Sequence, residues 1–126
     1  MQTITTLALL VPGYDQALAF YVGGLGFVLL DDVDQGPKRW VRVAPAGGGA
    51  ALLLARAEGA RQTAAIGDQA GGRVFLFLET DDFNRDAARI TAAGGIFEEA
   101  ARDEPYGRVA VWRDPFGNRW DLIQPR

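Results

Sequence analysis

The stretch "TLALLVPGYDQALAFYVGGLGF" at residues 6–27 decides the fold, because a second stretch of the same design follows it. That second copy, "FLFLETDDFNRDAARITAAGGI", occupies residues 75–96 and aligns with the first at an offset of 69 residues, without a gap. Apolar positions coincide at this offset, as where Tyr14 matches Phe83. A repeat of this kind predicts a duplicated module, and two modules that face each other form a cleft.

Both copies have the same order of predicted elements. An apolar strand leads through a turn into an amphipathic helix, glycines end the helix, and three further strands follow. Aspartates are expected to cap the helix starts, Asp15 in the first copy and Asp81 or Asp82 in the second. The predicted class is α+β, with two β-α-β-β-β modules forming curved mixed sheets around a cleft and helices outside.

The length of 126 residues is enough for one domain with a sizeable core. We expect a single domain over residues 1–126, with module 1 at about 1–57, a linker at about 58–72 and module 2 at about 73–126. The linker segment is rich in Ala, Gly and Gln and shows little periodicity, which favours a connection over a regular element.

The composition excludes several function classes. A net charge of −3 without a basic cluster argues against nucleic-acid binding. No apolar run reaches the ~18 residues of a membrane helix, no signal peptide is recognisable and cysteine is absent, so we expect a cytoplasmic protein without membrane contact. Histidine is also absent, so carboxylates, Tyr, Lys or Arg must do any acid–base work.

Alternation along the strands sorts the side chains by face. In the last strand both alternating sets mix polar and apolar residues, so the pattern leaves open whether Asp121 faces the cleft. Tyr106 lies in a segment that is expected to overhang the mouth of the cleft. The concave face is expected to carry aromatic and charged side chains: Trp40, Arg42, Phe75, Phe77, Glu79, Arg108 and Trp112.

The paired modules, together with "VPGYDQALAFYVGGLGF" at residues 11–27 and "DPFGNRWDLIQ" at residues 114–124, resemble the vicinal oxygen chelate superfamily. This superfamily includes glyoxalase I, bleomycin-resistance proteins and extradiol dioxygenases. The resemblance covers essentially the whole chain and implies a single glyoxalase-like domain. It also implies a metal site in the family's enzymes, where four inward side chains, usually His, Gln or Glu, hold a divalent ion.

Carried onto this chain, the resemblance places the four ligand positions at Thr6, Leu52, Phe75 and Asp121. The 69-residue offset links Thr6 to Phe75 and Leu52 to Asp121. One carboxylate, one hydroxyl and two hydrocarbons form a poor donor set, because hard cations take about six oxygen ligands. We therefore expect no metal and no other cofactor.

The leading hypothesis is a metal-free, small-molecule-binding protein, similar to bleomycin-resistance proteins and forming a homodimer. An apolar or aromatic ligand would lie in the cleft, with Asp121 or an arginine orienting a polar group. The expected contacts come from the side chains Trp40, Arg42, Phe75, Phe77, Arg108, Trp112 and Tyr106.

Two other functions compete with this one. In the first, the protein is a glyoxalase-like lyase or isomerase that uses Asp121 or Glu79 as its base, with or without weakly bound divalent metal. In the second, it is an interaction module whose concave surface is filled by its own side chains. Plain structural roles also compete, since Asp121 could pair with a nearby arginine and the aromatic side chains could pack in a core.

Overall fold

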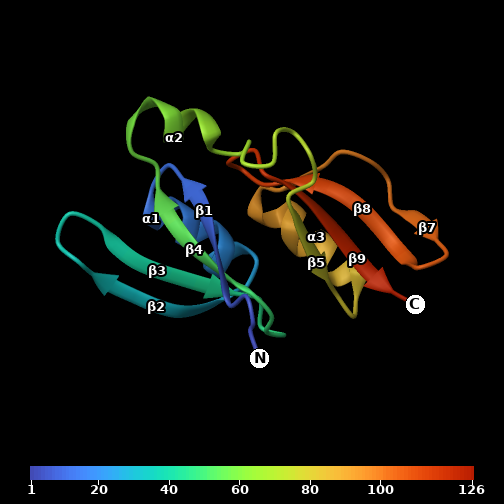
Figure 1. Cartoon of the computed structure of the whole chain (residues 1–126). Coiled ribbons are helices and arrows are strands. Elements are labelled where there is room, and N and C mark those ends of the chain that lie inside the picture. The colour runs from blue at the N-terminus through green and yellow to red at the C-terminus, as the bar shows by residue number, and fades with distance from the viewer. The chain divides into compact units, whose positions relative to one another are not determined.

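The computed structural model describes residues 1–126 and contains two compact units, Met1–Ile66 and Gly67–Arg126. Each unit has one sheet and a helix that follows its first strand, and the four main strands of each sheet run in β-α-β-β-β order (Figure 1). The predicted α+β class with two such modules is therefore confirmed. None of the helices combines the length and the apolar composition needed to cross a bilayer.

The first unit is built on a four-stranded sheet, sheet 1, in the order β1-β4-β3-β2, with β1 parallel to β4 and the other pairs antiparallel. Its first helix, α1, runs directly into a π-helical segment, η1. A short helix, α2, forms in the segment that was expected to be an irregular linker. The elements are β1 (Thr6–Val11), α1 (Tyr14–Leu18), η1 (Ala19–Gly24), β2 (Val28–Asp34), β3 (Arg39–Ala44), β4 (Ala51–Arg56) and α2 (Gly59–Ala65).

Alternating apolar residues of sheet 1 pack under α1 and η1. Leu9 and Val11 of β1 and Val41 and Val43 of β3 are completely buried, which is the alternation that the sequence predicts. Full burial of such a side chain stabilises the fold by about 1.5–3 kcal/mol, so this face holds the helix in place.

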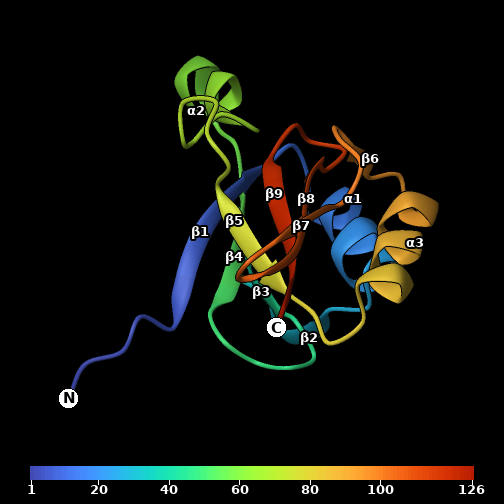
Figure 2. The same ribbon diagram turned by 90° about the vertical axis from the view of Figure 1, so that its right-hand side faces the viewer.

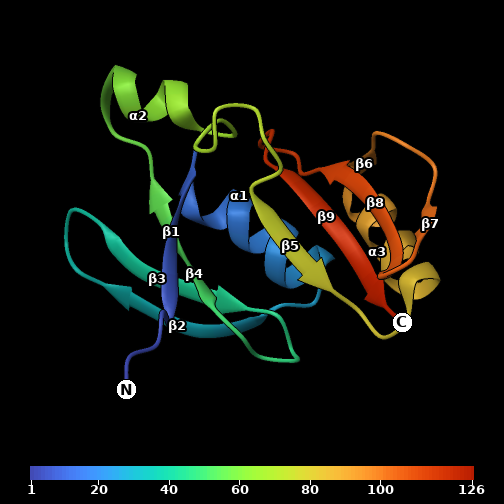
Figure 3. The same ribbon diagram turned by 45° about the vertical axis from the view of Figure 1, so that its right-hand side comes forward.

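The second unit is built on sheet 2, in the order β5-β9-β8-β6, with β7 paired to the first residues of β8. Strands β5 and β9 are parallel neighbours (Figure 3), and β9 pairs with β8 in antiparallel fashion. Helix α3 lies against one face of this sheet (Figure 2). The elements are β5 (Leu76–Glu79), α3 (Phe83–Ala93), β6 (Ile96–Phe97), β7 (Arg102–Glu104), β8 (Gly107–Arg113) and β9 (Arg119–Pro125).

The two main helices start in different ways. The carboxylate of Asp82 accepts a hydrogen bond from the backbone N–H of Arg85 at 3.1 Å and caps α3 as predicted. The corresponding prediction for Asp15 is wrong: α1 has no side-chain cap, and Asp15 pairs with Arg39 at 2.9 Å instead. Gly94, at φ 110°, ends α3 in the left-handed conformation that a side chain would disfavour.

The "DPFGN" turn between β8 and β9 is held by one buried carboxylate. Oδ1 of Asp114 accepts the backbone N–H groups of Phe116 at 2.9 Å and Asn118 at 3.0 Å. Oδ2 accepts Nδ2 of Asn118 and Nε1 of Trp120, both at 3.0 Å. Four donors thus converge on Asp114, which fixes the hairpin and the register of β9.

Candidate functional site

The face of sheet 2 that points away from α3, here named the helix-free face of sheet 2, carries Asp121. Along β9 the side chains of Trp120 and Leu122 are buried on the helix side, so Asp121 between them points the other way. This settles the alternation that the sequence left open. Alternate residues of β9 share this face with Asp121, and so do their pairing partners on β5 and β8. They are Phe75, Phe77, Glu79, Val109, Val111, Arg119 and Ile123.

Asp121 and Phe77 are direct neighbours in the parallel pair of β5 and β9. Neighbouring strands lie about 4.8 Å apart, so the two side chains stand next to each other. Phe77 is 64% exposed, which is unusual for a phenylalanine. Oδ1 of Asp121 is buried and has no hydrogen-bond partner. An exposed aromatic ring and a carboxylate oxygen without a hydrogen-bond partner therefore lie next to each other on this face.

Asp121 forms no ion pair with an arginine. Arg119 instead pairs with Glu98 at 2.8 Å and donates to the carbonyl of Gly72 at 2.9 Å. Arg42 pairs with Asp31 at 2.6 Å. The structural alternative in which an arginine pairs with Asp121 is thus wrong.

Burial and the charged groups around Asp121 act on its pKa in opposite directions. Burial raises the pKa of Asp121 above its ordinary value, and the negative charge of Glu99 acts in the same direction. The positive charges of Arg102 and Arg119 partly offset this rise. The carboxyl is therefore harder to ionise than a free aspartate, because it is desolvated without receiving a hydrogen bond in return.

Sequence reasoning missed Arg102 and Glu99 as members of this site. Arg102 stands opposite Val109 in the pairing of β7 with β8, which places it on the helix-free face. It binds Glu99 at 2.8 Å and Glu104 at 2.9 Å. The run "EEAARDE" sets one arginine among four acidic residues and was the available signal, but the short strand β7 that carries Arg102 has no apolar alternation of its own.

The face predicted for β8 is wrong. Trp112 is completely buried and stacks on Trp120, with ring centroids 5.0 Å apart and 16° between the planes. Arg108 lies over the ring of Phe83 in α3, 5.2 Å from its centroid. Both residues therefore face the helix, where they cannot line the helix-free face. Each alternating set of β8 combines apolar residues with one arginine, so hydrophobicity does not distinguish the two faces, and the pairing with β9 shows the orientation.

Sheet 1 places its two predicted residues on its own helix-free face. Trp40 is 39% exposed, and Arg42 alternates with the buried Val41 and Val43, as the sequence predicts. Arg42 is already engaged, since its Nε binds Asp31 and its Nη1 donates to the hydroxyl of Thr6 at 3.2 Å. Trp40 therefore provides exposed aromatic surface on the helix-free face of sheet 1.

The family's metal-ligand position that the sequence placed at Leu52 falls on Leu53 in the structure. Leu7 of β1 corresponds to Leu76 of β5, 69 residues on, whereas their partners Leu52 and Trp120 lie 68 residues apart. Leu52 is accordingly buried on the helix side, as Trp120 is. The equivalent of Asp121 is Leu53, because Ala8 pairs with Leu53 as Phe77 pairs with Asp121.

The corrected set of family positions does not fit a divalent cation. Thr6 offers one hydroxyl that already accepts a hydrogen bond from Arg42, and Leu53 and Phe75 offer none. Asp121 is left as a single carboxylate ligand, far from the about six oxygens that a hard cation takes.

Three further residues that the sequence predicted for the site lie at the ends of strands of sheet 2 or in a turn between them. Phe75 directly precedes β5 and donates its N–H to the carbonyl of Arg119 at 2.9 Å. Glu79 ends β5 and is exposed opposite Ile123. Tyr106 lies in the tight turn between β7 and β8 and is 58% exposed.

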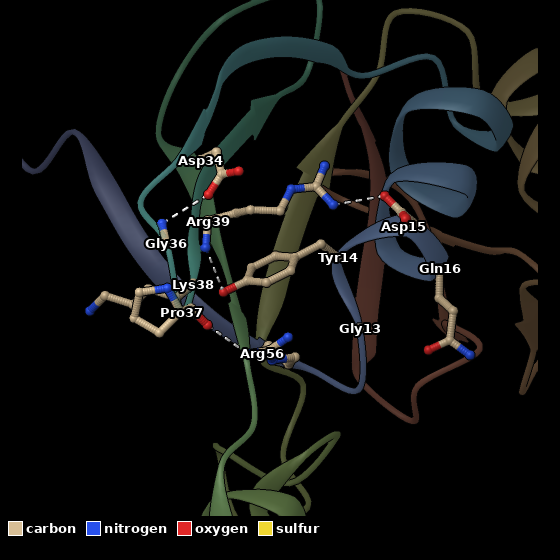
Figure 4. A pocket seen from close by; sticks show the side chains of 10 residues that line it. All are labelled: Gly13, Tyr14, Asp15, Gln16, Asp34, Gly36, Pro37, Lys38, Arg39 and Arg56. Atoms are coloured by element: carbon tan, nitrogen blue, oxygen red, sulfur yellow. Dashed lines mark hydrogen bonds and ion pairs between the residues drawn. The ribbon is translucent and has the colours of Figure 1, made fainter.

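A hollow of about 470 Å³ in the first unit surrounds Tyr14 (Figure 4). The ring of Tyr14 lies between the guanidinium groups of Arg39 and Arg56, 5.2 and 5.4 Å from its centroid, and its hydroxyl accepts the N–H of Arg39 at 3.2 Å. Arg39 also binds Asp15 and Asp32, at 2.9 and 2.7 Å. These groups satisfy one another, and the network joins α1 to β3.

Known proteins resemble this chain over nearly its whole length. An uncharacterized protein of Shewanella frigidimarina (strain NCIMB 400) is 51% identical over 126 residues, which cover 98% of this chain and 93% of that protein. TnmS3, an antibiotic binding protein from Streptomyces sp. CB03234, is 29% identical with a TM-score of 0.76, and the match covers 100% of this chain and 98% of TnmS3. A glyoxalase/bleomycin resistance protein from the same Streptomyces is 33% identical with a TM-score of 0.67, over 95% of this chain and 99% of that one.

The family model described as the Glyoxalase/Bleomycin resistance protein/Dioxygenase superfamily matches residues 3–122. The paired modules and the "DPFGN" turn lie inside this range. The chain therefore belongs to the Glyoxalase/Bleomycin resistance protein/Dioxygenase superfamily.

Proposed function

We propose that this protein binds a small apolar or aromatic molecule without the help of a metal, as a member of its superfamily similar to bleomycin-resistance proteins. The observation that carries the proposal is the exposed ring of Phe77 beside the unsatisfied carboxylate of Asp121 on the helix-free face of sheet 2. Apolar surface with a small number of orienting polar groups is the usual composition of a small-molecule site.

The chemistry of the family positions supports a site without metal. Thr6, Leu53 and Phe75 replace the side chains that would hold the ion, so binding rests on apolar contact and hydrogen bonds. The similarity to TnmS3, itself an antibiotic binding protein, supports a ligand of drug-like size. Trp40 offers a second aromatic surface, on the helix-free face of sheet 1.

Thermal denaturation with a panel of polycyclic aromatic and glycopeptide antibiotics tests this function. A ligand present at about 100 times its Kd stabilises the native state by about 2.7 kcal/mol. We expect at least one compound to raise the Tm by several degrees, and Phe77→Ala to abolish that rise without lowering the Tm of the free protein. If no compound raises the Tm, or if Phe77→Ala leaves the rise intact, the proposal fails.

Elemental analysis of protein purified without chelator tests the metal-free part of the proposal. We expect less than about a tenth of an equivalent of any divalent metal, because hard cations need more oxygen ligands than this donor set provides. Near-stoichiometric metal that disappears in Asp121→Ala would contradict it.

A lyase or isomerase reaction is the second candidate function. The raised pKa of Asp121 and its unsatisfied oxygen favour it, since a general base works best when its pKa approaches the working pH. Exchange of deuterium from solvent into an α-hydroxy ketone, lost in Asp121→Asn and kept in Glu79→Gln, would establish this chemistry.

We also propose that the protein is a cytoplasmic homodimer. Exposed apolar side chains of the edge strand β2, Val28, Leu29, Leu30 and Val33, support self-association. Sedimentation equilibrium is expected to give twice the mass of the 13.6 kDa chain, and a monomer at micromolar concentration would contradict this.

A further inference from the structure

The unsatisfied oxygen of Asp121 indicates what the ligand carries. Buried polar atoms in native proteins are almost always hydrogen-bonded, so each exception calls for an explanation. Oδ1 of Asp121 is such an exception, and its flanks are the apolar side chains of Val111 and Phe77. A hydrogen-bond donor on a bound molecule would supply the partner that the protein itself does not provide.

The charges around Asp121 select the kind of donor. Arg102 is matched by Glu99 and Glu104, and Arg113 and Arg119 share Glu98. These three arginines are therefore engaged by glutamates, whereas Asp121 has no ion-pair partner. An anionic group would be repelled by the carboxylate of Asp121, and a neutral hydroxyl would leave this carboxylate without an ion-pair partner. A cation would satisfy both the hydrogen bond and the charge.

The aromatic neighbour points in the same direction. Phe77 exposes its ring beside Asp121, and a cation within about 6 Å of an aromatic face is attracted by the ring. The apolar part of a ligand gains from contact with the same ring and with Ile123, which alternates with Asp121 on β9.

We propose that the ligand of the helix-free face of sheet 2 is an aromatic molecule with a protonated amine, whose N–H donates to the carboxylate of Asp121 while its ring rests on Phe77. This inference rests on the proposed function and adds the chemical class of the ligand. It also distinguishes the two faces, because the equivalent of Asp121 on sheet 1 is Leu53, which cannot receive a cation.

Three probes of the same shape test the inference by isothermal titration calorimetry at pH 7: 2-naphthylmethylamine, 2-naphthylmethanol and 2-naphthoate. We expect the amine to bind at least tenfold more tightly than the alcohol, and the acid to bind more weakly than either. Asp121→Asn should remove the preference for the amine and leave the affinity for the alcohol unchanged. Asp103→Asn, which removes an exposed carboxylate of β7 opposite Arg108, should change none of the affinities.

The outcomes separate this inference from the function on which it rests. Equal binding of the amine and the alcohol, or an amine preference that survives Asp121→Asn, overturns the cationic ligand while small-molecule binding stands. Phe77→Ala should weaken both the amine and the alcohol, and the amine more strongly, because the amine also loses the attraction between its charge and the ring. If none of the three probes binds at millimolar concentration, both the ligand class and the binding site on this face are overturned.

Discussion

Replacing Asp121 by asparagine should stabilise the free protein, although most substitutions of partly buried residues destabilise. The carboxylate loses water on folding and receives no hydrogen bond at Oδ1 in return. A buried polar group without a partner costs about 1–3 kcal/mol, and more when it is charged. The amide keeps the shape of the side chain and removes the charge, so we expect a gain of about 1 kcal/mol at pH 7.

The pH dependence of this gain follows from the raised pKa of Asp121. Burial makes the folded-state pKa higher than the unfolded value of 3.8, so protonation favours the native state. Below pH 3.8 the carboxyl of Asp121 is protonated in both states and does not lower the free energy of unfolding of the wild type. The buried charge lowers this free energy as the pH rises through the folded-state pKa. The charged groups that face Asp121, which are Glu99, Arg102 and Arg119, remain in both proteins, so their own titration largely cancels in the comparison.

Urea denaturation of the wild type and Asp121→Asn between pH 3.5 and 8 measures the effect, with Asp103→Asn as the matched surface control. The stability difference should be near zero at the acid end and reach about 1 kcal/mol at neutral pH, about 4 °C in Tm. A variant that is less stable than the wild type at pH 7 would show that Asp121 has a partner within the folded chain, and a difference that does not change with pH would show that folding does not raise its pKa.

Three further outcomes are expected. Asp114→Ala should lower the free energy of unfolding by about 3–5 kcal/mol in urea denaturation, because four hydrogen-bond donors lose their acceptor, whereas Asp103→Ala should stay within about 0.5 kcal/mol. Glu99→Gln should destabilise at pH 7, and progressively less as the pH falls below the unfolded value of 4.5 and through the lower folded-state pKa: the N–H of Val111 and then Arg102 lower the pKa of Glu99, so its stabilisation exists above the unfolded pKa and disappears as the pH falls. Trp112→Ala should lower the Tm through loss of about 3–5 kcal/mol and leave binding on the helix-free face unchanged in a calorimetric titration, since Trp112 lies in the core.

The sequence predicted the elements that repeat and alternate. The 69-residue offset aligns Tyr14 with Phe83, the residues at which α1 and α3 begin, but the cap expected at Asp15 placed the start of the first helix too late. Val41 and Val43 could be assigned to the helix side because polar residues alternate with them.

The errors have two physical sources. The offset falls to 68 residues at the last strands, because the connections inside the two modules differ in length, and this moved the equivalent of Asp121 from Leu52 to Leu53. In β8 each face combines apolar residues with one arginine, so Trp112 was assigned to the wrong side; its stacking on Trp120 required knowledge of the register between two strands. Pairing between strands is not encoded in the alternation of either strand alone.

Duplication gave the two modules equivalent positions, and their side chains have since taken different roles. In the first module Arg42, the equivalent of Val111, introduces a charge on the helix-free face and is matched there by Asp31. In the second module the charge belongs to Asp121 and is left unmatched. A fold under selection for stability alone would pair or remove that carboxylate, as the first module did with its own charge. The asymmetry between the two copies therefore supports the proposal that the protein binds a ligand on the helix-free face of sheet 2.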